Sequence, residues 1–222
     1  MLKLLIFDLD GTLADTSQDI TDALNYALEP FGPRTYSVEE TKAMVGSGIS
    51  NLLHSLVAQP ARNGDDVSAM EKDVVSRFLD FYSRHLLDKT TAYPGVKETL
   101  PRLPEYRKAV LSNKRAQYSR EILEGLGIAR YFDVIWGSDS VREKKPSPVP
   151  VLDLLARFSA DREEAAVVGD SNYDVEASKA AGVRVVAVTY GFRSREVLKD
   201  ADCLIDRFDD LLNVLTELNQ KR

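Results

Sequence analysis

Four groups of polar residues along the chain have the types and spacing that could carry chemistry. Most follow a short apolar run, the place where a strand of an α/β fold ends and ligands bind. The groups are Asp8, Asp10 and Thr12; Ser112 and Asn113; Lys145; and Asp170 and Asp174. Taken singly they have ordinary explanations as solvated loop polarity, turn or helix-cap residues and a surface lysine. Their convergence on one edge of one sheet is what indicates a site.

The acids in these groups predict a metal site. Three carboxylates that lie close together repel one another, and a bound divalent cation keeps them ionised. Oxygen ligands without a neighbouring histidine or thiolate favour Mg²⁺ over zinc. Mg²⁺ also accepts substrate phosphate as a ligand, while a lysine, a hydroxyl and backbone N–H groups complete a phosphate cradle. The cluster therefore predicts phosphoryl chemistry with Mg²⁺ as the cofactor.

The spacing of Asp8 and Asp10 suggests two different tasks. Asp8 is placed to attack phosphorus in line and form an aspartyl phosphate. Asp10 is placed to donate a proton to the leaving alkoxide and later to accept one from the attacking water. Phosphate-monoester hydrolysis is among the slowest uncatalysed reactions, so covalent and electrostatic catalysis are both needed.

Composition narrows the class of partner. The chain has 222 residues, 44% of them hydrophobic, and a formal net charge of −6. This charge argues against nucleic acid or an anionic membrane surface as a partner, and no run approaches the ~20 apolar residues of a membrane span. The single cysteine, Cys203, cannot form an internal disulfide. We expect a cytoplasmic protein acting on a small phosphorylated metabolite, as a monomer or homodimer.

The order of apolar runs predicts an α/β fold. Buried strands are expected near residues 2–7, 108–113, 133–136, 165–170, 184–189 and 203–205. Strand–helix alternation with short connections implies a doubly wound, Rossmann-like parallel sheet covered on both faces. Residues 15–89 instead carry helical stripes at 20–28, 49–56 and 70–81. We therefore expect a core of residues 1–14 and 90–222, with a helical insert of residues 15–89 after the first strand.

Four segments resemble the motifs of the haloacid dehalogenase superfamily, in the same order and across the whole core. They are DLDGT at 8–12, LSN at 111–113, KKPSP at 144–148 and GDSNYD at 169–174. The insert resembles the small α-helical cap domain of that superfamily. Asp10 separates the chain from the dehalogenases proper, which lack the second acid, and groups it with the phosphatases and phosphomutases.

The resemblance implies a role for each motif residue. Asp8 is the nucleophile and a Mg²⁺ ligand, Asp10 is the acid and base and binds the metal through its backbone carbonyl, and Asp170 is the third protein ligand. Asp174 is expected not to bind the metal directly but to reach it through a water molecule or to hold the lysine in position. Lys145, which directly precedes a proline as in the family pattern, neutralises the phosphoaspartate. The residues expected to bind the phosphoryl group are Thr12, Ser112 and Asn113.

Within the superfamily the chain most resembles the bacterial phosphoglycolate phosphatases. Supporting stretches outside the shared motifs are MVGSGISNLL, YPGVKETLPRL, KKPSPVPVLDLL and VTYGF. The substrate expected from this resemblance is 2-phosphoglycolate. Gly46, Ser47 and Gly48 in the insert can present backbone N–H groups to a small anion such as its carboxylate. The same glycines are equally explained by a tight turn between two helices.

Other functions fit parts of the pattern. A pyrophosphatase, a β-phosphoglucomutase or a phosphatase for another metabolite would use the same motifs. A phosphorylation-dependent signalling module also gathers acids, a hydroxyl and a lysine around Mg²⁺, but it needs neither the long insert nor Asp10. A catalytically inactive binding protein would not need Asp8, Asp10, Lys145 and Asp170 together.

Overall fold

The computed structural model describes residues 1–46, 48, 52–54, 56 and 67–220 of the chain. The chain forms two compact units. One comprises Met1–Asp15 and Thr91–Arg222, and the other comprises Thr16–Thr90.

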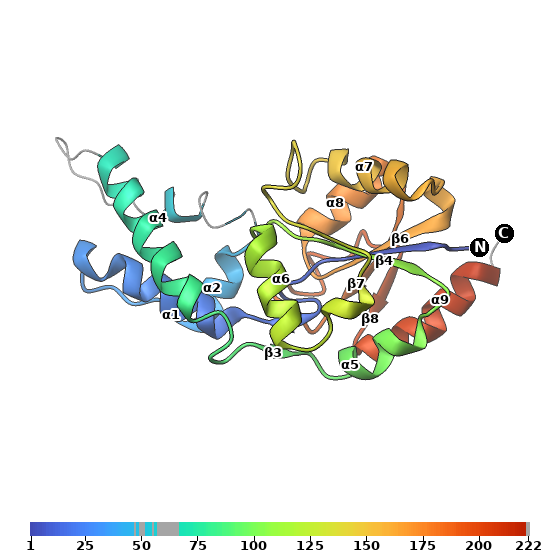
Figure 1. Ribbon diagram of the computed structural model, residues 1–222, viewed down its shortest axis with the longest axis horizontal. Helices are drawn as coiled ribbons and strands as arrows, with labels where there is room; N and C mark the ends of the chain where they lie inside the picture. The colour runs from blue at the N-terminus through green and yellow to red at the C-terminus, as the bar shows by residue number, and fades with distance from the viewer. Residues whose placement is uncertain (47, 49–51, 55, 57–66, 221–222) are drawn as a thin grey trace. The chain divides into compact units, whose positions relative to one another are not determined.

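The first unit is built on a six-stranded sheet in which all strand pairs are parallel (Figure 1). In spatial order its strands are β5 (Val134–Trp136), β4 (Arg107–Leu111), β1 (Leu4–Phe7), β6 (Ala165–Gly169), β7 (Arg184–Val188) and β8 (Cys203–Ile205). The predicted α/β fold with a doubly wound parallel sheet is thereby confirmed. Strands β1, β4 and β6 are short and almost entirely buried, which explains why they appear in the sequence as continuous apolar runs rather than as alternating ones.

Strand β1 lies at the point where the strand order reverses. It pairs with β4 on one side, where Phe7 is opposite Val110, and with β6 on the other, where Phe7 is opposite Val168. The chain fills the β4 side of β1 first and the β6 side afterwards. The carboxyl end of β1 is therefore the switch point of the sheet, the position beyond which ligands bind in open α/β folds.

Helices cover both faces of this sheet (Figure 1). Helices α7 (Val149–Phe158) and α8 (Asn172–Ala181) lie on one face, where they share an apolar cluster with Leu4 and Ile6 of β1. Phe7 points to the other face and contacts the ring of Phe208, just before α9 (Leu211–Gln220). The remaining helices of this unit are α5 (Val96–Thr99), α6 (Ala116–Gly125) and the 3₁₀ turns η2 (Leu100–Arg102), η3 (Ala129–Tyr131), η4 (Arg162–Glu164) and η5 (Phe208–Asp210).

The second unit is helical in its described part. It contains α1 (Ser17–Leu28), η1 (Glu29–Phe31), α2 (Val38–Met44) and α4 (Val67–Arg84), and α1 packs against α4. The predicted stripes at 20–28 and 70–81 lie in α1 and α4. Of the third stripe, Leu52 and Leu53 are buried, while Ile49 lies outside the described residues.

Helix α2 was not predicted, because its sequence lacks an apolar stripe. Only Thr41 is buried along it. The helix begins instead with a capping box, in which the Ser37 hydroxyl accepts from the Glu40 N–H and the Glu40 carboxylate accepts from the Ser37 N–H. Local hydrogen bonds thus stabilise the N-terminus of this helix, although its hydrophobic pattern does not predict one.

Two very short strands mark the ends of the insert. β2 (Ala14–Asp15) pairs antiparallel with β3 (Thr91–Ala92), with Asp15 opposite Thr91. Neither strand was predicted, since two residues are too few to show alternation. The pairing holds the segments that enter and leave residues 16–90 side by side.

Candidate active site

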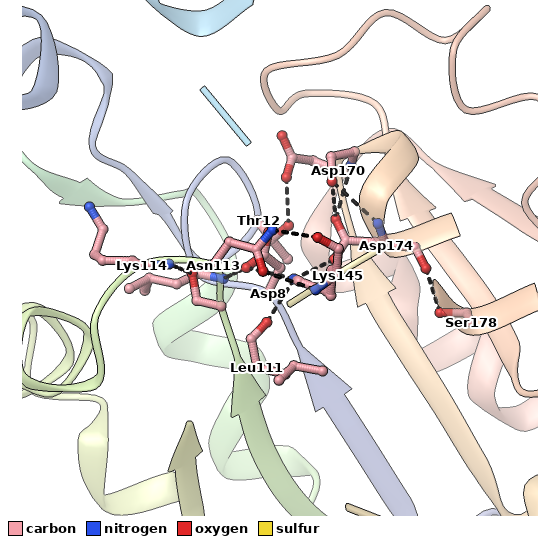
Figure 2. A network of polar contacts seen from close by, with 12 residues as sticks. Asp8, Thr12, Leu111, Asn113, Lys114, Lys145, Asp170, Asp174 and Ser178 are labelled. Carbon is pink, nitrogen blue, oxygen red and sulfur yellow. Dashed lines mark hydrogen bonds and ion pairs between the residues drawn. The ribbon is translucent and has the colours of Figure 1, made fainter. Parts of the chain in front are cut away.

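Lys145 lies at the centre of a buried polar network (Figure 2). Its Nζ is 3.0 Å from Asp8 Oδ1 and 2.6 Å from Asp174 Oδ1, and it donates to the Leu111 carbonyl at 2.7 Å. Only 3% of the Lys145 side chain is exposed, against 12% for Asp8 and none for Asp174. The three donor positions of the ammonium group are therefore taken by the ends of β1 and β4 and by α8.

The side chain of Asn113 fixes the loop that carries Lys145. Asn113 Nδ2 donates to the Lys145 carbonyl at 2.9 Å, and the Lys145 N–H donates to Asn113 Oδ1 at 3.1 Å. This paired bond ties the loop to the end of β4. A lysine that precedes a proline outside any regular element is thus held in place without a helix or strand of its own.

Asp174 is held by the first turn of α8. Its Oδ2 accepts from the Ser171 N–H and from the Ser171 hydroxyl, while the Asp174 N–H donates back to that hydroxyl. Ser171 is thus the N-cap of α8, which leaves Asp170 available to the site. Gly169 permits this packing, since a Cβ there would lie 2.3 Å from Asp174 Cγ.

Asp170 is oriented by two donors from different loops. Thr12 Oγ1 donates to Oδ1 at 3.2 Å, and the Phe192 N–H donates to Oδ2 at 2.6 Å. The Tyr190 hydroxyl donates to the Thr12 carbonyl at 2.9 Å and so connects the same two loops. Thr12, which was expected to bind the phosphoryl group, is fully buried and has its hydroxyl on Asp170.

Asp10 has a cationic partner of its own. Lys114 Nζ lies 3.0 Å from Asp10 Oδ1. The loop that carries Asp10 turns sharply after β1, because the Leu9 carbonyl accepts from the N–H groups of residues 12, 13 and 14. Asp8 and Asp10 therefore both lie beyond the carboxyl end of β1, each beside a different lysine.

Burial of the acids makes their charge unfavourable. Burial raises the pKa of Asp8 to about 7, helped by the nearby carboxylates of Asp174 and Asp10 and opposed by Lys145. Burial and the neighbouring acids also raise the pKa of Asp170 well above its usual range. Although burial lowers the pKa of Lys145, its two carboxylate partners outweigh this and the net direction is upward. The cluster formed by Asp8, Asp170, Asp174 and Lys145 therefore favours the binding of a proton or a cation.

The charge and geometry fit a divalent cation. Counted in their ionised forms, the four carboxylates (Asp8, Asp10, Asp170, Asp174) carry two more charges than the two ammonium groups (Lys114, Lys145), and a bound divalent cation would balance this difference. Oxygen atoms of Asp8, Asp170 and Asp174 all lie within 4.8 Å of one another. Each oxygen of Asp174 accepts from Lys145 or Ser171, and each oxygen of Asp170 accepts from Thr12 or Phe192. A carboxylate oxygen that accepts one hydrogen bond retains a lone pair, so these contacts leave both acids able to bind a metal. Oxygen donors of this kind suit Mg²⁺.

The structure brings most of the predicted site residues to one sheet edge. Those gathered there are Asp8, Asp10, Thr12, Ser112, Asn113, Lys145, Asp170 and Asp174. Gly46 and Gly48 belong to the second unit and have positive φ angles of 142° and 92°. Their role in substrate binding stays a prediction, and Ser47 lies outside the described residues.

Three residues that orient or accommodate the acids of the site were given no role in the sequence analysis. Lys114 pairs with Asp10, the Phe192 N–H orients Asp170, and Gly191 makes room, since a Cβ there would lie 2.3 Å from Asp170 Cβ. The signals were present: Lys114 directly follows the LSN segment, and Gly191 and Phe192 close the VTYGF stretch. Their partners could not be known without the fold.

Comparison with known proteins gives a consistent result. Residues 5–188 match the family described as haloacid dehalogenase-like hydrolase. A phosphoglycolate phosphatase from Chromobacterium violaceum is 34% identical over 216 residues, 96% of each chain, and one from Vibrio parahaemolyticus is 34% identical over 222 residues with the same coverage. A crystal structure described as a predicted phosphoglycolate phosphatase from Haemophilus somnus has a TM-score of 0.90 and 30% identity, covering 96% of this chain and 98% of that one.

Proposed function

Because this chain belongs to the haloacid dehalogenase-like hydrolase family and is a phosphatase of that family, we propose that it hydrolyses 2-phosphoglycolate to glycolate and phosphate. The observation that carries the chemistry is the contact of Lys145 with both Asp8 and Asp174, beside Asp170, at the carboxyl ends of β1 and β6. This arrangement offers a nucleophile, a fixed positive charge and oxygen ligands around one point.

The first half-reaction forms a bond between an Asp8 carboxylate oxygen and phosphorus. The bond from phosphorus to the bridging ester oxygen breaks at the same time, and Asp10 donates a proton to that oxygen as the alcohol leaves. Lys145 stands 3.0 Å from Asp8 and balances the negative charge that gathers on the phosphoryl oxygens. The fixed ammonium needs no reorganisation during this step.

The second half-reaction releases phosphate. Asp10, now ionised, accepts a proton from water as the water oxygen attacks phosphorus, and the bond to Asp8 breaks. Ser112 and backbone N–H groups after β4 are proposed to hold the phosphoryl oxygens in both steps. The enzyme returns to its starting state with Asp8 ionised and Asp10 protonated.

Asp8, Asp170 and the Asp10 carbonyl are proposed to hold Mg²⁺. When bound, this ion would act as a Lewis acid on the phosphoryl oxygens and offset their negative charge. Thr12 and the Phe192 N–H keep Asp170 in its orientation, and Asp174 keeps Lys145 in place. A carboxylate oxygen that accepts one hydrogen bond retains a lone pair for a metal, so these contacts are compatible with ligation.

The substrate assignment rests on the relatives and on the insert. The relatives that match nearly the whole chain are named phosphoglycolate phosphatase. The second unit is proposed to act as a cap, and the N–H groups of Gly46 and Gly48 are proposed to bind the substrate carboxylate. No helix in the described part of the chain is long and apolar enough to cross a bilayer, and we propose a cytoplasmic site of action on a small metabolite.

A panel of phosphorylated metabolites tests this proposal. We expect Mg²⁺-dependent phosphate release that is fastest with 2-phosphoglycolate and is abolished by a chelator. Asp8→Asn should lose activity by at least about 10³-fold, because no nucleophile remains. A preference for pyrophosphate or a sugar phosphate would reassign the substrate, and full activity of Asp8→Asn would refute the covalent route.

A further inference from the structure

We propose that Lys114 is a positioning residue that holds the Asp10 carboxyl group for proton transfer to the leaving oxygen. This inference rests on the proposed function and adds to it a residue outside the four motifs. Its basis is the 3.0 Å contact between Lys114 Nζ and Asp10 Oδ1, with only 7% and 13% of the two side chains exposed. A pair this sheltered is little screened by solvent and persists as an orienting contact.

The backbone of Lys114 is itself fixed. Its N–H donates to the Ser112 hydroxyl at 3.3 Å, and its carbonyl accepts from the Ser138 N–H at 2.8 Å. Gly137 packs directly against this segment, since a Cβ there would lie 2.4 Å from the Lys114 carbonyl oxygen. The side chain therefore starts from a defined point, which reduces the entropy lost when its ammonium group is held at Asp10.

The two lysines of the site serve different acids. Lys145 Nζ is occupied by Asp8, Asp174 and the Leu111 carbonyl. Figure 2 shows the Lys114 side chain extending away from that network. The pairing of Lys114 with Asp10 joins the loops after β4 and β1, which are neighbouring parallel strands. Asp10 therefore has a positive partner that does not compete for the nucleophile.

The consequence concerns the orientation of the Asp10 carboxyl group. The contact of Oδ1 with the Lys114 ammonium group holds the carboxyl plane in one orientation. Asp10 is thereby presented to the bridging oxygen of the ester in a fixed position. Without Lys114 the carboxyl group could rotate, and a misplacement of about 1 Å costs on the order of 10²-fold in rate.

Three phosphate esters separate this role from the others. Ethyl phosphate and 2-phosphoglycolate have alkoxide leaving groups that need a proton, whereas p-nitrophenyl phosphate has a leaving group that departs without one. For Lys114→Met we expect kcat/KM to fall roughly 10- to 100-fold on both alkyl esters. On the aryl ester the change should stay below about 3-fold. Lys114→Arg, which retains the cation, should recover part of the loss.

The retained aryl ester activity reports that the variant is folded. Lys199→Met, which removes an exposed lysine outside the site, should leave all three values unchanged. A fall confined to 2-phosphoglycolate would overturn the inference and assign Lys114 to the substrate carboxylate. An equal fall on all three esters would also overturn it. If the wild-type protein hydrolyses none of the three esters, the proposed function itself fails. If the wild type is active but Lys114→Met gives one of the two contradicting patterns, only the inference about Lys114 fails.

Discussion

Asp8, the proposed nucleophile, lies in surroundings where a negative charge is unfavourable for stability. It is a carboxylate beyond the end of a fully buried strand, with 12% of its side chain exposed and two other acids nearby. Lys145 offsets only part of this cost. A group held in such surroundings is poorly solvated, which favours its use as a nucleophile once a metal restores the charge balance.

The raised pKa of Asp8 makes the stability of the metal-free protein depend on pH. The folded state binds the Asp8 proton more tightly than the unfolded chain, with a pKa of about 7 against 3.8. The contribution of Asp8 to stability is therefore complete below pH 3.8 and is lost as the pH rises through about 7. Asp170 shifts in the same direction.

We therefore expect Asp8→Asn to be more thermally stable than the wild type at about pH 8 in a chelator, and the difference to shrink or reverse at about pH 5. The amide keeps the shape of the side chain and removes the buried charge. Thermal unfolding at the two pH values measures this. Asp200→Asn, at an exposed position, is the matched control and should change little. A variant less stable than wild type at pH 8 would contradict the dominance of burial.

At the scale of elements, the loops that follow the strands decide the site. Gly11 has a φ of +84°, and a Cβ there would lie 2.1 Å from Asp170 Oδ2. Gly127, just after the C-cap of α6, has a similar φ of +75° but nothing within 4 Å of its Cβ position. Both glycines thus have a positive φ angle, but only Gly11 has another side chain, that of Asp170, next to its Cβ position.

This difference gives a matched pair of substitutions. Gly127→Ala should lose about 1 to 2 kcal/mol of stability, because alanine disfavours positive φ. Gly11→Ala should lose more, because its Cβ would also displace the buried Asp170 carboxylate. Only Gly11→Ala should also lose activity, by at least about 10²-fold, since Asp170 must move. Enzyme assays and denaturant unfolding of both variants test this. Equal activity of the two would show that the position of Asp170 is not critical.

At the scale of the whole molecule, the site described above lies entirely in the first unit. Every side chain of the Lys145 network and of the Lys114–Asp10 pair comes from residues 1–15 or 91–222. The insert begins and ends at β2 and β3, where Asp15 pairs with Thr91. A helical unit can be inserted there with little disturbance of the sheet, since its two ends are already neighbours.

We expect a chain in which a short Gly-Ser linker replaces residues 16–90 to fold cooperatively, with the secondary structure of the parallel sheet. Added Mg²⁺ should raise its melting temperature, because a ligand that binds only the folded state stabilises it. Hydrolysis of 2-phosphoglycolate should be lost or much reduced, since the proposed cap is absent. Circular dichroism and thermal unfolding with and without Mg²⁺ provide the measurement. Failure to fold would mean that the sheet unit needs the insert for its own stability.

Much of this fold and site could be predicted because the signals are local. A buried parallel strand appears as an apolar run, and the residue that follows it must lie at the ligand-binding edge. Asp8, Ser112 and Asp170 could therefore be assigned to one edge before any coordinates. Strands β2 and β3 could not be predicted, because two residues carry no periodicity, and α2 is set by a capping box rather than by a stripe.

The sequence alone determined the fold class, the order of the strands along the chain and the acids at their ends, because each depends on residue type and spacing. Only the tertiary structure decided the partnerships: Lys145 with Asp8 and Asp174, Lys114 with Asp10, and Thr12 with Asp170. These contacts join residues up to 158 positions apart. Residues so far apart in the sequence come into contact only when the strand order and register are fixed, and that order follows from the packing of the whole sheet.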